Sequence, residues 1–157
     1  MPTVEVTFTP LPAHVRTARL IATAVARRSG VDESLLDEVR LAVGEACSRA
    51  VEAHRLHCPA ELIRVALTDD GERFEVVVTD AAPPDLVTSG AAASNVATAE
   101  TPHAMAGALV VDGIVQQLPA GVGLAVIAGL ADDVRVTPAS DGTSIAMSWK
   151  RRAVPAR

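Results

Sequence analysis

The sequence contains few cysteines and few aromatic residues. Among its 157 residues, Cys47 and Cys58 are the only cysteines, and they do not form a C-x-x-C pair. Two isolated cysteines exclude a disulfide scaffold, and their spacing fits neither a redox motif nor a zinc motif. The large rings are limited to Phe8, Phe74 and Trp149, and tyrosine is absent. We therefore expect a core of Ala, Val and Leu, which dominate the 49% of hydrophobic residues.

Positive charge is also scarce. The chain has 19 Asp and Glu residues against 14 Lys and Arg residues, which gives a net charge of −5 at pH 7. Because binding to nucleic-acid phosphates requires a surplus of cationic side chains, nucleic acid is not an expected direct partner. Part of the positive charge lies at the C-terminal end, and we expect residues 151–157 to form a short, solvated basic tail.

Long uninterrupted hydrophobic runs are missing as well. No run reaches the roughly 18 apolar residues that a membrane-spanning helix needs, so no membrane association is expected. The N-terminal residues do not show the basic, apolar and small-residue regions of a secretory signal. We therefore expect a cytoplasmic protein with one domain over residues 1–150, since domains of about 100–150 residues are common.

Hydrophobic periodicity predicts an α+β fold. Alternating patterns favour strands, and patterns with helical spacing favour helices. The predicted strands cover residues 3–9, 61–68, 72–79, 134–138 and 143–150, and the predicted helices cover residues 13–28, 32–55 and 124–130. Asp-Gly pairs before the third and fifth strands predict hairpins. This order predicts a two-layer sandwich with helices on one face of a mixed, mostly antiparallel sheet.

One long internal segment has weak structural signals. Residues 86–119 are rich in Ala, Ser, Thr, Gly and Pro. Segments of this length without regular structure are uncommon inside compact domains, and they are often functional. We expect either a variable, lid-like segment or a partly disordered one.

Glu45 is the first candidate functional residue. It lies in a predicted helix among apolar neighbours, where a carboxylate can act as a general base with a shifted pKa. Arg49 follows four residues later. The alternative is therefore an exposed Glu45–Arg49 ion pair that only supports the helix.

Two further features suggest a ligand site. Asp80 follows an apolar strand, where carboxylates often contact ligands, although aspartates also start turns. Gly121 and Gly123 open an apolar helix, where free backbone amides favour a phosphate. The alternative is a glycine-bearing loop that leads into a tightly packed helix. A dinucleotide fingerprint fits poorly, because its third glycine position holds Val126.

Together, these segments resemble the ATP-binding fold shared by gyrase, sensor histidine kinases and anti-sigma serine kinases. The first conserved box of that fold resembles DEVRLAVGEACSRAVEAH (37–54), and TDAAPPD (79–85) falls where the second box is expected. The third box and the final hairpin resemble GVGLAVIAGLADDVRV (121–136) and DGTS (141–144). The order, the spacing and the short length are most similar to the anti-sigma branch.

The resemblance implies roles for the matching residues. Glu45 matches the catalytic base, and Asp80 matches the aspartate that binds the amino group of adenine. Gly121 and Gly123 match the phosphate end, and Thr143 matches a threonine near the adenine. ATP is the cofactor that this pattern implies.

Two positions depart from the family pattern. Arg49 stands where the family has a magnesium-binding asparagine, and Ala82 replaces the glycine of the second box. A guanidinium group carries only donors and cannot ligate a metal, so the usual magnesium site is not expected. Arg49 either supplies positive charge in place of the ion or pairs with Glu45 and silences the base.

By resemblance, the chain is an anti-sigma regulatory factor with a degenerate nucleotide site and weak or no kinase activity. Such a protein binds a sigma factor and is itself bound by an anti-anti-sigma factor. One alternative is an active ATP-dependent serine/threonine kinase that phosphorylates the anti-anti-sigma factor. Another is an ATPase-like domain of a histidine-kinase pathway, although no phospho-acceptor helix is visible. Homodimers are frequent among relatives of this type.

Overall fold

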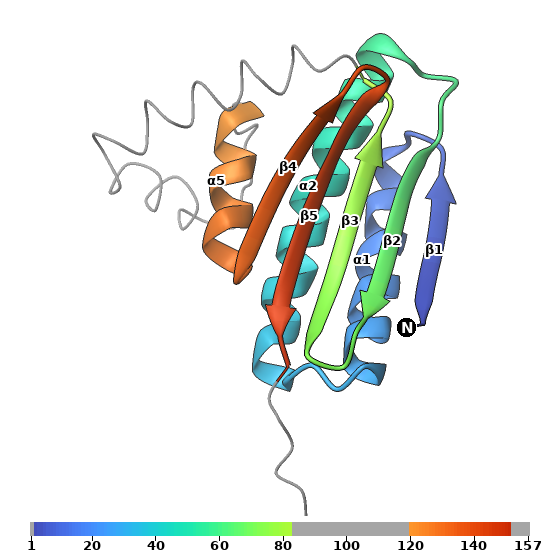
Figure 1. Cartoon of the computed structure of the whole chain (residues 1–157). Coiled ribbons are helices and arrows are strands. Elements are labelled where there is room, and N and C mark those ends of the chain that lie inside the picture. The colour runs from blue at the N-terminus through green and yellow to red at the C-terminus, as the bar shows by residue number, and fades with distance from the viewer. Residues whose placement is uncertain (1, 83–119, 152–157) are drawn as a thin grey trace, which may run out of the picture.

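The computed structural model describes residues 2–82 and 120–151 (Figure 1). Its elements, in chain order, are β1 (Thr3–Phe8), α1 (Pro12–Arg28), the 3-10 helix η1 (Glu33–Leu35), α2 (Leu36–His57), β2 (Ile63–Asp69), β3 (Arg73–Asp80), α5 (Ala120–Leu130), β4 (Asp133–Ala139) and β5 (Gly142–Lys150). Every strand and helix predicted from the sequence is present. The expected lid-like segment lies outside the described residues, as does the basic tail beyond Arg151.

The strands form one open sheet in the order β1-β2-β3-β5-β4. Each neighbouring pair of described strands is antiparallel. The expected sheet was mixed and mostly antiparallel, and the described strands contain no parallel pair. The β2–β3 hairpin turns at Gly71, which adopts a φ of +91°. Asp70 supports this turn, because its carboxylate accepts hydrogen bonds from the amides of Glu72 (2.9 Å) and Arg73 (2.6 Å).

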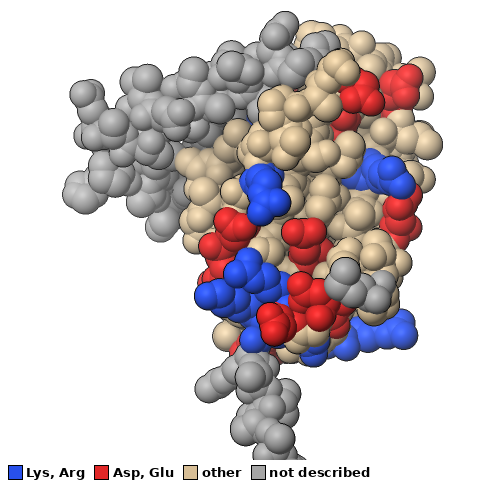
Figure 2. All heavy atoms as spheres, in the orientation of Figure 1, with Lys and Arg blue, Asp and Glu red and all other residues tan. Residues whose placement is uncertain are grey.

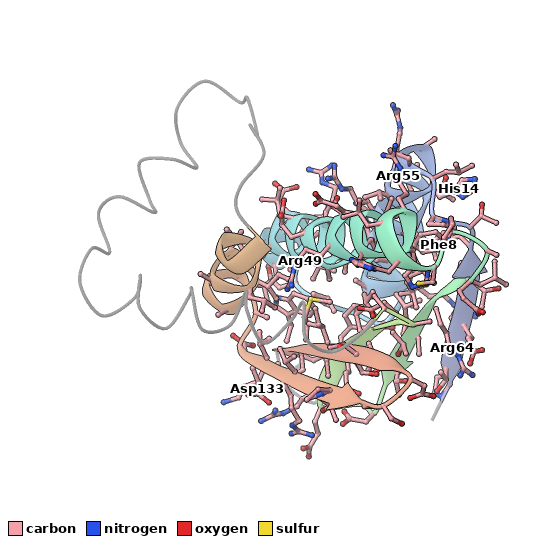
Figure 3. The ribbon with its side chains drawn as sticks, turned by 90° about the horizontal axis from the view of Figure 1, so that it is seen from above. Phe8, His14, Arg49, Arg55, Arg64 and Asp133 are labelled. Carbon is pink, nitrogen blue, oxygen red and sulfur yellow. The ribbon has the colours of Figure 1, made fainter. Side chains whose placement is uncertain are left out.

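Helices α1, α2 and α5 cover one face of the sheet, as predicted (Figures 1 and 3). Alternate residues of the central strands point into this layer and are buried. The largest fully buried side chains include Trp149, Phe74, Ile63, Leu67, Ile127 and Met147. Buried alanines on α1 and α2 keep these two helices close together, which confirms the expected core of small residues.

Trp149 ties the last strand to α5. Its ring lies opposite Phe74 in the β3–β5 ladder, with the ring centroids 6.3 Å apart. Its Nε1 donates a hydrogen bond to the carbonyl oxygen of Leu130, at the C-terminal end of α5, over 2.9 Å. A buried indole N–H needs such a partner, so this bond fixes how α5 lies against the sheet.

The opposite face of the sheet is exposed, and acidic and basic side chains are interspersed on it (Figure 2). One ion pair there joins Arg64 on β2 to Glu5 on β1 over 2.8 Å. Both of its side chains are exposed, so solvent screening leaves the pair little effect on stability. None of the helices that the structure describes combines the length and the apolar character needed to cross a bilayer.

Candidate functional site

The fold brings together the three segments that were singled out from the sequence. Glu45 and Arg49 lie on successive turns of α2, next to α5. A Cβ atom built on Gly123 of α5 would lie 3.1 Å from Arg49 Cδ and 3.6 Å from Glu45 Oε2. Asp80 and Thr143 are direct partners in the β3–β5 ladder. We call Glu45, Arg49, Asp80, Gly123 and Thr143 the cleft residues, and the candidate nucleotide site that the resemblance assigns to them the cleft.

Helix α5 begins earlier than the sequence predicted. The apolar pattern places its start at residue 124, whereas the helix begins at Ala120. Gly121 and Gly123 therefore lie inside its first turns and not in a loop before it. Glycine disfavours helix by about 1 kcal/mol relative to alanine, and packing against α2 overrides this local preference.

Asp80 and Thr143 form the polar end of the cleft. Asp80 Oδ1 accepts a hydrogen bond from the Ala82 amide over 3.0 Å. Burial raises the pKa of Asp80 above its ordinary value, and the amides of Ala82 and Thr143 oppose this rise. The Thr143 side chain is only 1% exposed, and its hydroxyl has no hydrogen-bond partner in the described part of the chain. Such a hydroxyl beside a carboxylate can bind a polar ligand group.

Gly142 makes the pairing of Asp80 with Thr143 possible. Its φ is +149°, which side chains rarely adopt. A Cβ at this position would lie 1.8 Å from the carbonyl oxygen of Asp80. The sequence indicated Gly142 only as part of a turn, and this close approach to β3 was not foreseen.

Glu45 is half-buried and does not form the expected surface ion pair. Among the described residues, no ion pair joins Glu45 to Arg49. Burial raises the pKa of Glu45 above its ordinary value, and the positive charges of Arg19 and Arg49 oppose this rise. The alternative of an exposed, helix-supporting ion pair is therefore not what the structure shows.

Glu45→Gln should stabilise the fold at neutral pH. Because the folded pKa of Glu45 is raised, its contribution to stability is complete below the unfolded pKa and is lost as the pH rises through the folded pKa. The variant should therefore gain over wild type at pH 7 and lose this gain near pH 4, in urea unfolding at both values. Glu75→Gln, on an exposed strand position, controls for the lost charge. An equal gain at both pH values would contradict the prediction.

Arg19 on α1 is a site residue that the sequence did not reveal. A Cβ on Gly44 of α2 would lie 2.2 Å from Arg19 Nε, so the Arg19 side chain crosses α2 where glycine leaves room. This Nε is buried without a hydrogen-bond partner among the described residues. The one available signal was Gly44 itself, since a mid-helix glycine disfavours the helix by about 1 kcal/mol.

Gly44→Ala should displace Arg19 and raise the pKa of Glu45. The added methyl group removes the space that the Arg19 side chain occupies, and Glu45 then loses an opposing positive charge. We expect little net change in unfolding free energy, because alanine favours the helix by about 1 kcal/mol. NMR titration of the Glu45 carboxyl measures the effect. Gly129→Ala on α5, where no atom lies within 4 Å of the new Cβ, should leave Glu45 unchanged.

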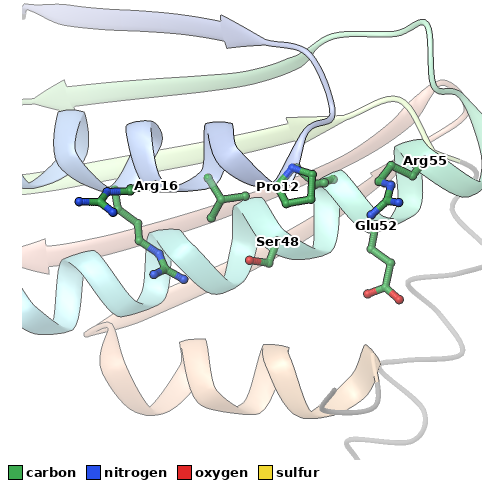
Figure 4. A pocket seen from close by; sticks show the side chains of 8 residues that line it. Pro12, Arg16, Ser48, Glu52 and Arg55 are labelled. Atoms are coloured by element: carbon green, nitrogen blue, oxygen red, sulfur yellow. The ribbon is translucent and has the colours of Figure 1, made fainter. Parts of the chain in front are cut away.

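Arg19 also lines a groove between α1 and α2 (Figure 4). The groove has a volume of about 440 Å³. Its walls consist of Pro12, Val15, Arg16, Arg19, Ser48, Val51, Glu52 and Arg55. Three arginines against one glutamate make this lining mainly basic. Through Arg19, the groove is electrostatically connected to Glu45.

His54 supports the polar end of the cleft from α2. Its ring is fully buried, and Nε2 accepts a hydrogen bond from the Ala81 amide over 2.8 Å. Nδ1 lies 3.1 Å from the carbonyl oxygen of Glu61, to which it donates, because only Nδ1 can carry the proton of this tautomer. No pattern in the sequence indicated this role of His54.

The residue at the position expected to ligate magnesium does not fit that ion. Magnesium bound together with a nucleotide takes most of its ligands from phosphates and waters, and usually only one or two oxygens from the protein. At the position that the resemblance assigns to a metal ligand, Arg49 places a guanidinium group. Burial lowers the pKa of Arg49, and the charges of Asp80, Glu52 and Glu45 oppose this.

Comparison with known proteins supports the fold. No curated protein matches the sequence significantly. The crystal structure of the RsbU and RsbW domains of Rv1364c from Mycobacterium tuberculosis is similar, with a TM-score of 0.62 and 18% sequence identity. The match covers 98% of this chain but only 34% of that longer chain. The family described as the histidine kinase-like ATPase domain matches residues 8–149, and this chain belongs to that family.

Proposed function

We propose that this protein is an anti-sigma regulatory factor that binds a sigma factor and an anti-anti-sigma factor. The family match and the similarity to a structure that contains an RsbW domain support this proposal, together with the resemblance of the sequence to the anti-sigma branch. A sigma-factor partner would place the protein in the cytoplasm. In this proposal the cleft residues bind ATP weakly, and kinase activity is low or absent.

The observation that carries the nucleotide part of this proposal is the assembly of the cleft residues around Arg49. Gly123 brings α5 against Arg49 and Glu45, and the Asp80–Thr143 pair offers a carboxylate and an unpaired hydroxyl. These groups can bind a nucleotide. Phosphoryl transfer, however, depends on a metal that neutralises the γ-phosphate, and Arg49 stands at the position of a metal ligand.

A binding experiment tests the proposed partners. The full chain is titrated with each sigma factor of its source organism, and small anti-anti-sigma proteins are then added as competitors. We expect a stable complex with at least one sigma factor and its release by an antagonist. If no sigma factor binds, the proposal is wrong.

The second candidate is an active serine/threonine kinase that phosphorylates the anti-anti-sigma factor. The missing Glu45–Arg49 ion pair among the described residues favours it, because an unpaired carboxylate can still act as a base. Transfer of labelled γ-phosphate to the antagonist would support this candidate if Glu45→Gln abolishes the transfer. Without transfer, the regulatory factor with low or absent kinase activity remains.

A further inference from the structure

We infer that the cleft takes ATP as the free anion, not as its magnesium complex, and that Arg49 neutralises the phosphates in place of the metal. This inference rests on the nucleotide binding in the proposed function. Three features of the cleft lead to it, and each concerns Arg49 directly.

The first feature is the position of the Arg49 side chain. A Cβ on Gly123 would lie 3.1 Å from Arg49 Cδ and 3.6 Å from Cγ, so the stem packs between α2 and α5 (Figure 3 labels Arg49). The charges of Asp80, Glu52 and Glu45 act on its guanidinium group. An arginine in such surroundings stays protonated, so the cleft carries a permanent cation.

The second feature is a hydrogen-bonding group without a partner. Arg49 Nη1 is buried and has no hydrogen-bond partner in the described part of the chain, and Arg49 makes none of the ion pairs found there. A buried N–H group that stays unpaired is unfavourable by about 1–3 kcal/mol, and more when the group is charged. A phosphate oxygen would satisfy it with a charge-assisted hydrogen bond.

The third feature is the poor fit of the cleft to magnesium. Arg49, at the position that the resemblance assigns to a magnesium ligand, carries only donors and cannot ligate a metal, and a second cation beside it would be repelled. The magnesium complex of ATP is also less negative than free ATP. The free nucleotide therefore gains more from Arg49 than the complex does.

Calorimetry with ATP tests the inference on the full chain, with EDTA in one buffer and excess magnesium in the other. We expect wild type to bind more tightly in EDTA. Arg49→Asn should lose roughly tenfold or more of the EDTA affinity, since a hydrogen bond to a charged group contributes about 1.5–3 kcal/mol. Its binding should then be tighter with magnesium. Arg49→Lys, which keeps the charge, should retain the preference of wild type.

Two controls separate contact with the phosphates from structural effects. Arg40→Asn removes a positive charge from an exposed position on the same helix and should bind ATP like wild type. Adenosine, which has no phosphate, should bind wild type and Arg49→Asn equally. An equal loss of adenosine and ATP affinity would show that Arg49 only maintains the cleft, and this would overturn the inference.

Tighter binding by wild type in magnesium would also overturn the inference. So would the absence of nucleotide binding in both buffers, because Arg49 would then block the cleft. The proposed regulatory function fails separately, if no sigma factor binds. Metal-free ATP binding without a sigma-factor complex would support the inference and disprove that function.

Discussion

Gly142→Ala should destabilise the protein by about 3 kcal/mol or more and impair nucleotide binding. The new Cβ would lie 1.8 Å from the carbonyl oxygen of Asp80 and 2.9 Å from Ala81 Cα. These are backbone atoms of a paired strand, so they cannot move away as the end of a flexible side chain can. Asp80 and Thr143, which face each other beside Gly142, would be pushed apart. Urea unfolding and ATP titration measure the two effects.

Gly71→Ala provides a matched control for Gly142→Ala. Gly71 also has a positive φ and also lies in a hairpin turn, but no atom lies within 4 Å of the place that its new Cβ would take. Alanine there carries only the conformational strain, about 1–2 kcal/mol. Nucleotide affinity should not change. If both variants lost the same stability, the close contact with Asp80 would not be the cause.

His54→Leu should destabilise the protein by about 2–4 kcal/mol, although leucine fills a similar volume. The Ala81 amide and the Glu61 carbonyl would both lose their hydrogen-bond partner, and each buried unpaired group is unfavourable by about 1–3 kcal/mol. Because Ala81 directly follows Asp80, ATP affinity should fall as well. Urea unfolding and calorimetry measure these changes.

His57→Leu is the control for His54→Leu. His57 lies one turn further along α2 and is exposed, so its replacement should change stability by no more than about 0.5 kcal/mol. If His54→Leu were as stable as this control, the two hydrogen bonds of His54 would make no net contribution.

Most of the fold was predictable because its signals are local. Alternating apolar residues and the Asp-Gly turns at 70–71 and 141–142 indicated both hairpins. Gly30, with a φ of +80°, follows the end of α1, where glycine commonly ends a helix. The glycines expected to open α5 do lie at its start, but the apolar pattern placed the helix only from residue 124, whereas it begins at Ala120, where contact with α2 supports residues that disfavour helix. Helix propensity depends on the local residues alone, so it does not reveal a contact between two helices.

The site was predictable only where the family resemblance extends. Local patterns singled out Glu45 and Asp80 and placed Arg49 one turn from Glu45, but only the resemblance related the two helix residues to Asp80 and Thr143 as parts of one site. The supporting contacts join residues that are far apart in the sequence, such as Arg19 with Gly44, His54 with Ala81 and Gly142 with Asp80. In the sequence alone, Arg19 looks like an ordinary surface arginine, His54 like a histidine on a helix and Gly142 like a glycine in a turn.

Trp149 provides an internal fluorescent reporter for the cleft. It is the only tryptophan in a chain without tyrosine, so the intrinsic emission comes almost entirely from one buried ring. Its indole N–H is bonded to Leu130 at one end of α5, and Gly123 near the other end packs against Arg49. A ligand that shifts α5 should therefore change the emission of Trp149. Unlabelled protein in a fluorimeter is then enough to follow binding at the cleft in real time.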